Sequence, residues 1–161
     1  MGKYKLGVIY SIFDSEELLE GSILQIRDQV DHICVVYQMQ SWGDSPCSPE
    51  LVPILERLNN IGLVDDLIKF DLPKNYDMTR ADSLDVAKKK LGIESLRKAD
   101  CTHCLIMDAD EFYISAEFEK AKNKVYEQGW THTACPYFNY HLFPTLRNKK
   151  TIGVVPFIQK L

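Results

Sequence analysis

The sequence predicts an α/β protein with a Rossmann-like, open, mainly parallel sheet and helices on both faces. Short apolar runs alternate with amphipathic segments along the chain, a pattern typical of βαβ units with right-handed crossovers. At least two of the runs end at polar or acidic residues, and the carboxyl edge of such a sheet is where ligands bind. With 161 residues and no linker-like segment, the chain is expected to form one domain over 1–161.

The first two strands are predicted at Leu6–Tyr10 and His32–Tyr37, which are short apolar runs. The segment Glu16–Val30 between them is predicted to be a helix, with Ser15 as its N-cap and acidic residues in its first turn. Its inward face is expected to carry apolar residues at helical spacing: Leu19, Ile23, Ile26 and Val30.

The middle of the chain predicts two further helices around a third strand. Ser48-Pro49-Glu50 reads as a helix start with proline at the first helical position. Asp66–Leu72 is the third strand. A helix is then expected over Thr79–Leu91, and Gly92 is expected to end it.

The last third of the chain predicts a fourth strand, His103–Met107, which stops at carboxylates. Ser115 is expected to cap a helix that runs to Gln128, with Gly129 as its C-cap. Two further apolar segments, Thr131–Tyr137 and Ile152–Ile158, are expected to be strands.

Composition narrows the function classes. The net charge of -4 argues against broad nucleic-acid binding. No apolar run reaches the roughly 20 residues of a membrane span, so no transmembrane segment is expected. The five cysteines are an odd number and are scattered, and Cys101-x-x-Cys104 has no second pair to complete a zinc site. We therefore expect reduced, structural thiols and a cytoplasmic location.

The motif Asp108-Ala109-Asp110-Glu111 directly follows the fourth strand. On an extended chain Asp108 and Asp110 would point to the same side. Two such carboxylates can share a divalent cation with the phosphates of a substrate, which suits Mg²⁺ or Mn²⁺. A strand that ends in a solvated acidic turn is the alternative.

Four segments, in this order, resemble the family 2-like glycosyltransferases of the GT-A fold. Val8–Leu19 is similar to the opening strand and acidic helix start of that family, and Asp31–Val36 to its second strand. Thr79–Ala87 resembles its arginine-containing helix. Cys104–Phe112 closely resembles its D-x-D segment in the D-A-D-E-F variant.

The resemblance implies a metal-dependent transferase that takes a sugar from a nucleotide-diphosphate donor, UDP- or GDP-linked, to an unknown acceptor. It assigns Asp110 to a Mn²⁺ or Mg²⁺ ion and Asp108 to the donor and the same metal site. Arg80 is the candidate basic group at the diphosphate, where departing negative charge needs stabilisation. A later histidine completes the metal shell in several such enzymes, which makes His141 the candidate and His132 a weaker one.

Donor contacts are also expected where the first two strands end. Ser11, Phe13 and Asp14 follow the first strand. The family usually has an aspartate after the second strand, whereas this chain has Tyr37 and Gln38. Tyr37 could stack on a base and Gln38 could hydrogen-bond its edge, so the identity of the base stays open.

The general base is not identified. Inverting members of the family, which this chain is expected to follow, use a carboxylate well downstream of the metal motif. This chain ends about 50 residues after Asp110, and Glu111 directly follows the metal ligands. Its apolar end lacks a stop signal, which fits an incomplete fold, a minimal domain, or a chain whose acceptor half is supplied elsewhere.

Two other functions remain open from the sequence. One is a non-catalytic module of the same fold that binds a nucleotide sugar or a protein, because fold alone does not fix function. The other is a metal-dependent nucleotide phosphohydrolase. Hydrolysis of the donor without transfer would identify the latter.

Overall fold

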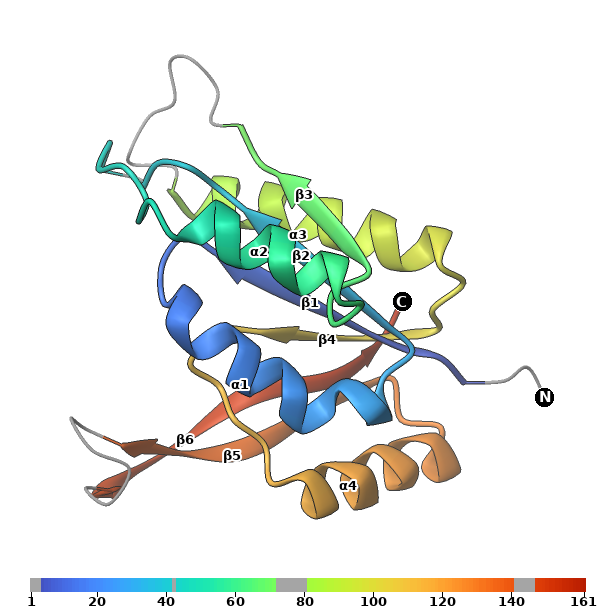
Figure 1. Ribbon diagram of the computed structural model, residues 1–161. Coiled ribbons are helices and arrows are strands. Elements are labelled where there is room, and N and C mark those ends of the chain that lie inside the picture. Colours follow the sequence, from blue (N-terminus) through green and yellow to red (C-terminus); the bar gives the residue numbers. More distant parts are fainter. Residues whose placement is uncertain (1–3, 42, 72–80, 141–146) are drawn as a thin grey trace.

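The computed structural model describes residues 4–41, 43–71, 81–140 and 147–161. These residues form a six-stranded sheet with helices on both faces (Figure 1). The elements in chain order are β1 (Leu6–Ile12), α1 (Glu16–Ile26), the 3₁₀ turn η1 (Arg27–Gln29), β2 (His32–Tyr37), α2 (Leu51–Asn60), β3 (Asp66–Lys69), α3 (Ala81–Lys98), β4 (His103–Met107), α4 (Ser115–Gln128), β5 (His132–Tyr140) and β6 (Arg147–Lys160).

The strand order is β3-β2-β1-β4-β6-β5. The four strands from β3 to β4 are mutually parallel, whereas β6 runs antiparallel to both β4 and β5. This arrangement confirms the predicted α/β class and the open, mainly parallel sheet. The last two strands are longer than predicted, because β5 and β6 pair with each other from His132–Gln159 to Tyr140–Arg147.

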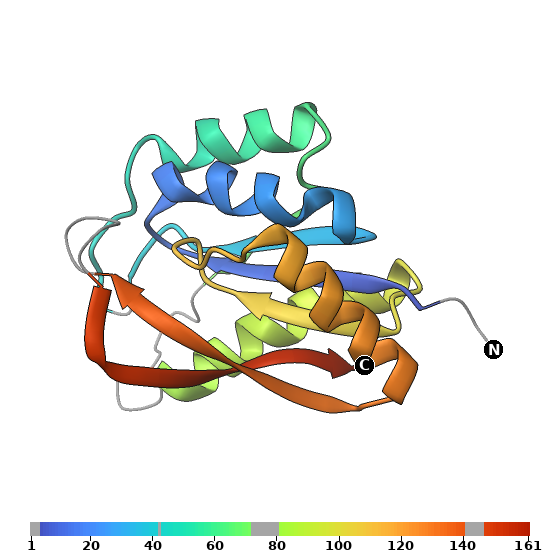
Figure 2. The same ribbon diagram turned by 90° about the horizontal axis from the view of Figure 1, so that it is seen from below.

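The two faces of the sheet carry different layers. One face packs against α1, α2 and α4 in a large apolar core that includes Val8, Ile23, Leu55 and Phe118. The other face packs against α3 in a smaller cluster around Ile9. In Figure 2, α1 and α2 lie on one side of the sheet and α3 on the other. Helices therefore cover both faces, as predicted.

Helix α3 corrects one sequence prediction, because it continues through Gly92 to Lys98. A Cβ atom at Gly92 would lie 2.5 Å from Cγ2 of Ile9, and one at Gly7 would lie 2.5 Å from Cδ2 of Leu96. Both glycines therefore let α3 approach β1 closely. Gly92 is present for packing and does not end the helix.

The first helix also differs from its prediction. Ser15 occupies the N-cap position, but its backbone is left-handed (φ 62°) and its side chain makes no capping hydrogen bond. The α-helix ends at Ile26 and continues as a 3₁₀ turn, after which Val30 is extended (φ −125°). The extended conformation lets the chain turn directly into β2.

The other helix ends fall close to their predicted positions. Helix α2 begins at Leu51, and the backbone N–H of Glu50 donates to Oγ of Ser48 at 3.1 Å in the turn before it. Ser115 is the first residue of α4 and not its cap. Gly129 is the C-cap as predicted, with a left-handed backbone (φ 63°).

All five cysteines are unpaired, which confirms the prediction of free thiols. Cys101 and Cys104 are buried, and burial raises the pKa of both thiols, that of Cys101 to about 11. A thiol with a raised pKa is a poor nucleophile at neutral pH. The burial of Cys101 and Cys104 agrees with the expectation of structural thiols.

No helix in the described ranges is both long and apolar enough to cross a bilayer.

Candidate functional site

Parallel pairing brings the ends of β1, β2 and β4 together. Tyr10 pairs with Met107 and Ile12 with Tyr37, so the residues that follow these partners reach the same edge of the sheet. Ser11, Gln38 and Asp108 meet there. Each is two residues beyond a side chain that faces α3, and those side chains are Ile9, Val36 and Ile106.

A cleft with two lobes opens at this edge. The first lobe is a cavity of about 260 Å³, and it is lined by Ser11, Phe13, Asp14, Gln38, Ser41, Asp85, Lys88 and Asp108. The second lobe is the cavity of about 330 Å³ lined by Ser11, Ile12, Asp14, Ser15, Asp108, Ala109 and Asp110. The lobes share Ser11, Asp14 and Asp108, so they are parts of one site.

The acidic motif forms a turn, in which the backbone N–H of Glu111 donates to the carbonyl of Asp108 at 3.1 Å. The segment is therefore a turn and not the extended chain that was expected, although both carboxylates still line one lobe. Ala109 is buried in the turn, while Asp108 and Asp110 are exposed and line the second lobe. Partial burial and the nearby charge of Asp110 raise the pKa of Asp108.

Two hydrogen bonds fix the position of this turn. Oγ of Ser22 on α1 donates to the carbonyl of Glu111 at 2.7 Å, and it lies 2.9 Å from the hydroxyl of Tyr10 on β1. The side chain of Glu111 is half-buried, and burial together with the charge of Asp108 raises its pKa to about 7. Glu111 lines neither lobe.

The carboxylate pair can be tested as a metal site by its chemistry. Mg²⁺ and Mn²⁺ accept one or two carboxylates, with water and substrate phosphates as the remaining ligands. Asp108 and Asp110 on one lobe meet that requirement. Within the described part of the chain, no group of three or more His, Cys, Asp or Glu residues could hold a metal ion. The residues therefore fit a metal that is shared with a phosphate ligand.

Gln38 lies at the bottom of the first lobe and is 1% exposed. Its Nε2 donates to the backbone carbonyl of Gln40 at 2.7 Å, which fixes the orientation of the amide. Its Oε1 is buried and has no hydrogen-bond partner among the described residues. Buried acceptors are normally satisfied, so the unpartnered Oε1 marks Gln38 as a polar group of the lobe whose hydrogen bonds the described residues leave incomplete.

Tyr37 does not share this position. Successive side chains of a strand alternate between the faces, and Tyr37 packs against the core on the α1 and α2 side. It lines neither lobe, so the cleft gives no support to its predicted stacking on a base. Phe13, which was also predicted to contact the donor, does line the first lobe and supplies an aromatic ring there.

Lys88 was not predicted from the sequence. It is 3% exposed, and its Nζ donates to the backbone carbonyl of Ile12 at 3.0 Å. Burial lowers its pKa to about 8, although the charges of Asp85, Asp108 and Asp14 act in the opposite direction. The sequence signal was a lysine on the buried stripe of the helix, four residues after Leu84.

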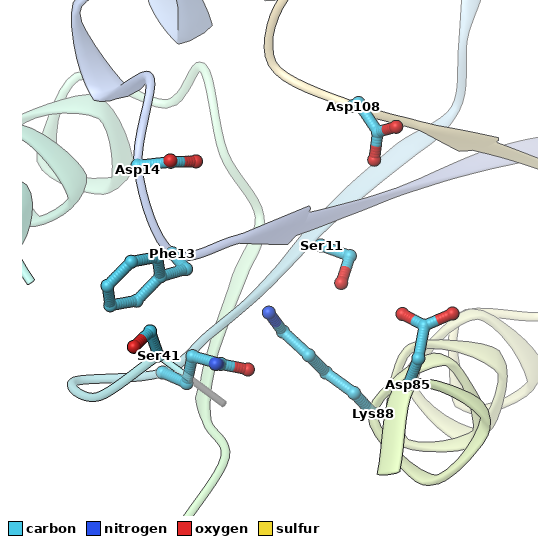
Figure 3. Close-up of a pocket in the computed structure, with 8 residues that line it drawn as sticks. Ser11, Phe13, Asp14, Ser41, Asp85, Lys88 and Asp108 are labelled. Atoms are coloured by element: carbon cyan, nitrogen blue, oxygen red, sulfur yellow. The ribbon is translucent and has the colours of Figure 1, made fainter. Parts of the chain in front are cut away.

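Figure 3 shows the ammonium of Lys88 pointing into the cleft. The side chains around it come from both ends of the pocket: Phe13 and Ser41 on one side, Asp85 and Asp108 on the other. Ser41 and Asp85 were also missed by the sequence analysis. Nothing marks Ser41 in the sequence, because its loop reaches the pocket only through the fold.

The remaining predicted residues fall outside the cleft or outside the described ranges. Arg80 and His141 lie outside the residues that the structure describes. His132 begins β5, where its pairing with Gln159 places it near the amino end of β4. That is the edge opposite Asp108, so His132 is not a ligand of a metal bound there.

The parallel sheet and the cleft at its carboxyl edge define a nucleotide-diphosphosugar transferase-like, or GT-A-like, α/β fold. The chain is similar in structure to S. aureus TarS 1-349, a GT-A family 2 glycosyltransferase, with a TM-score of 0.53 and 13% sequence identity. The match covers 81% of this chain and 34% of the TarS chain. No protein-family model and no curated protein matches the sequence. The resemblance predicted from the motifs is thus confirmed at the level of the fold.

Proposed function

We propose that the chain is a metal-dependent glycosyltransferase that binds a nucleotide-diphosphate sugar in the two-lobed cleft. The observation that carries this proposal is the division of chemistry within the cleft. The buried amide and the aromatic ring line only the first lobe and Asp110 lines only the second, whereas Asp14 and Asp108 line both and Asp85 and Lys88 also line the first. A nucleotide sugar has the matching division, because its base and its diphosphate lie at separate positions along one molecule.

The first lobe supports binding of a nucleobase. Oε1 of Gln38 has no partner among the described residues, and a small movement of this side chain would let it accept from the ring N–H of uracil or guanine. Phe13 adds a ring face next to it, and stacking of a base on an aromatic ring is worth about 1–3 kcal/mol. These features support a UDP- or GDP-linked donor.

The second lobe supports a Mn²⁺ or Mg²⁺ ion held by Asp110 and Asp108. When bound, such an ion neutralises charge on the departing diphosphate. The pair of carboxylates, one of which raises the pKa of the other, provides the negative site that a cation needs. The hydrogen bond from Ser22 to the carbonyl of Glu111 keeps the turn in place for this role.

The proposal names neither the acceptor nor the general base. An inverting reaction requires a carboxylate to deprotonate the acceptor hydroxyl. Glu111 has the raised pKa of about 7 that suits a base, but it does not line the cleft. That observation favours a second candidate, a module of this fold that binds the nucleotide sugar without transferring it.

The test is isothermal titration of the chain with UDP and GDP, with and without Mn²⁺. We expect micromolar binding of one nucleotide that depends on the metal. Asp110→Asn should reduce the affinity in Mn²⁺ to its metal-free level, because the substitution removes a charge and preserves the shape. Glu119→Gln, at an exposed position on α4, is the matched control and should bind as the unmodified chain does.

Two outcomes decide between the candidates. A folded chain that binds neither nucleotide would overturn the proposal. If one nucleotide binds, incubation with the corresponding nucleotide sugars and analysis of the products by mass spectrometry separates the functions. Transfer to an added acceptor identifies a glycosyltransferase, sugar 1-phosphate with nucleoside monophosphate identifies a phosphohydrolase, free sugar with nucleoside diphosphate identifies transfer of the sugar to water, and an intact donor identifies a binding module.

A further inference from the structure

Lys88 is a buried cation for which the described residues supply only part of a hydrogen-bonding shell. An ammonium group has three N–H donors, and one of them is used by the carbonyl of Ile12. Among the described residues, no carboxylate oxygen lies within 4.0 Å of its nitrogen. The most direct candidate, Asp85, is instead paired with Lys89 at 2.6 Å.

Burial of a charged group is costly unless the group is paired and hydrogen-bonded. A lysine whose role was only to fill the space between α3 and the sheet could be replaced by an apolar residue of the same length. The ammonium instead lines the first lobe, where an anion can reach it. The geometry is therefore that of a binding group that gains its remaining partners from a ligand.

The position of Lys88 within the cleft indicates which part of a ligand it meets. The carbonyl of Ile12 accepts both from Nζ of Lys88 and, at 3.1 Å, from the backbone N–H of Gln38. Lys88 is thus adjacent to Gln38, the residue that the proposed function places at the base. In Figure 3 its nitrogen lies between Phe13 and Asp108, that is, between the aromatic end of the cleft and the carboxylates.

We propose that Lys88 binds the diphosphate of the donor and donates a hydrogen bond to a phosphate oxygen. This inference rests on the proposed function, because it assumes a nucleoside diphosphate in the cleft. Asp14, Asp85 and Asp108 on the same lobe oppose a second negative charge. A fixed cation among these carboxylates would offset this repulsion.

The experiment compares each nucleoside diphosphate with its nucleoside by isothermal titration in Mn²⁺, using UDP with uridine and GDP with guanosine. Lys88→Met removes the charge and keeps the length of the side chain. Lys88→Gln also removes the charge but retains a donor, and serves if the methionine variant does not fold. Lys88→Arg preserves the charge. Lys90→Met, at an exposed position of the same helix, makes the same change in net charge.

We expect the two neutral Lys88 variants to bind the diphosphate about 10- to 100-fold more weakly, the range typical for loss of a hydrogen bond to a charged group. Affinity for the nucleoside should be unchanged, and the arginine and Lys90 variants should keep most of the diphosphate affinity. Circular dichroism and a thermal melt confirm that each variant is folded.

Two results would overturn the inference, and they differ in what they imply. If the unmodified chain binds the diphosphate and the neutral variants bind it equally well, Lys88 does not contact phosphate and the proposed function stands. The same holds if diphosphate and nucleoside affinities fall together, which would show that Lys88 only supports the pocket. If the unmodified chain binds neither diphosphate, both proposals are wrong.

Discussion

The two faces of the sheet have different roles. The face under α1, α2 and α4 holds the large apolar core, whereas the face under α3 holds a smaller cluster and contacts the helix through two glycines. Ser11 near the end of β1 and Gln38 just after β2 continue the α3 face to the carboxyl edge, and Lys88 comes from α3 itself. The face under α1, α2 and α4, which we call the thick layer, holds most of the apolar core that stabilises the fold. The face under α3, which we call the thin layer, provides the first lobe of the cleft.

The largest expected change is a loss of stability caused by a substitution in the thick layer. Leu55→Ala, on α2, removes a side chain that is 1% exposed, and such truncations cost about 2–5 kcal/mol in the free energy of unfolding. The folded fraction should bind UDP or GDP as the unmodified chain does. Urea unfolding followed by titration at low urea measures both quantities.

The control for this change is Leu24→Ala on α1, because Leu24 is 58% exposed. Its stability should change by less than about 0.5 kcal/mol. If Leu55→Ala abolished nucleotide binding in molecules shown to be folded, the division of roles between the two faces would fail.

A smaller effect is expected in the thin layer. Gly92→Ala would place a Cβ atom 2.5 Å from Ile9, and overpacking of this kind costs about 1–3 kcal/mol. Because Lys88 is one helical turn from Gly92, displacement of α3 should also weaken nucleotide binding. The same titration and urea unfolding test both effects.

Gly21→Ala in α1 is the matched control, since the nearest atom to its added Cβ would be in the Phe112 ring at 3.4 Å. That variant should be neutral or more stable by up to about 1 kcal/mol, from helix propensity. Equal behaviour of the two alanine variants would show that the close approach of α3 to β1 is not required.

The smallest effect concerns the amino edge of the sheet, far from the cleft. Burial and the charge of Lys160 lower the pKa of His103 below its ordinary value of 6.5. The unfolded chain therefore binds this proton more readily than the folded chain, so stability is lost as the pH falls below about 6.5. Nucleotide binding should not follow this titration.

His103→Gln, which cannot titrate, should have a shallower dependence of unfolding free energy on pH between pH 5 and 7. Urea unfolding at several pH values compares the two proteins. Equal slopes would show that His103 does not contribute to the pH dependence.

Much of the fold could be predicted because the β1 to β4 region follows local rules. Apolar runs between helical segments predicted each strand of that region, and the acidic motif marked the carboxyl edge. The antiparallel pairing of β5 with β6 could not be predicted, since it depends on contacts between distant residues. Gly92 was misjudged because glycine both ends helices and permits close packing, and only the neighbouring Ile9 distinguishes the two.

The site was predicted in part for the same reason. Six of the predicted residues line the cleft, and their roles as donor or metal contacts stay predictions: Ser11, Phe13, Asp14, Gln38, Asp108 and Asp110. Tyr37 does not line the cleft, because the alternation of β2 turns it to the other face. Lys88 was missed because a lysine in a helix is usually solvated, and its burial depends on how α3 lies on the sheet.

The backbone carbonyl of Ile12, which accepts hydrogen bonds from both Lys88 and Gln38, also bears on the alignment of β1 in the sheet. Because the acceptor is a backbone carbonyl, the contact does not depend on the side chain at position 12. It does depend on the register of β1, which sets where this carbonyl lies. A slip of one residue would exchange the two faces of the strand and leave the ammonium of Lys88 buried without its acceptor. Misaligned pairing of β1 would therefore cost the free energy of burying an unpaired charge, and Lys88 favours the native register of the strand.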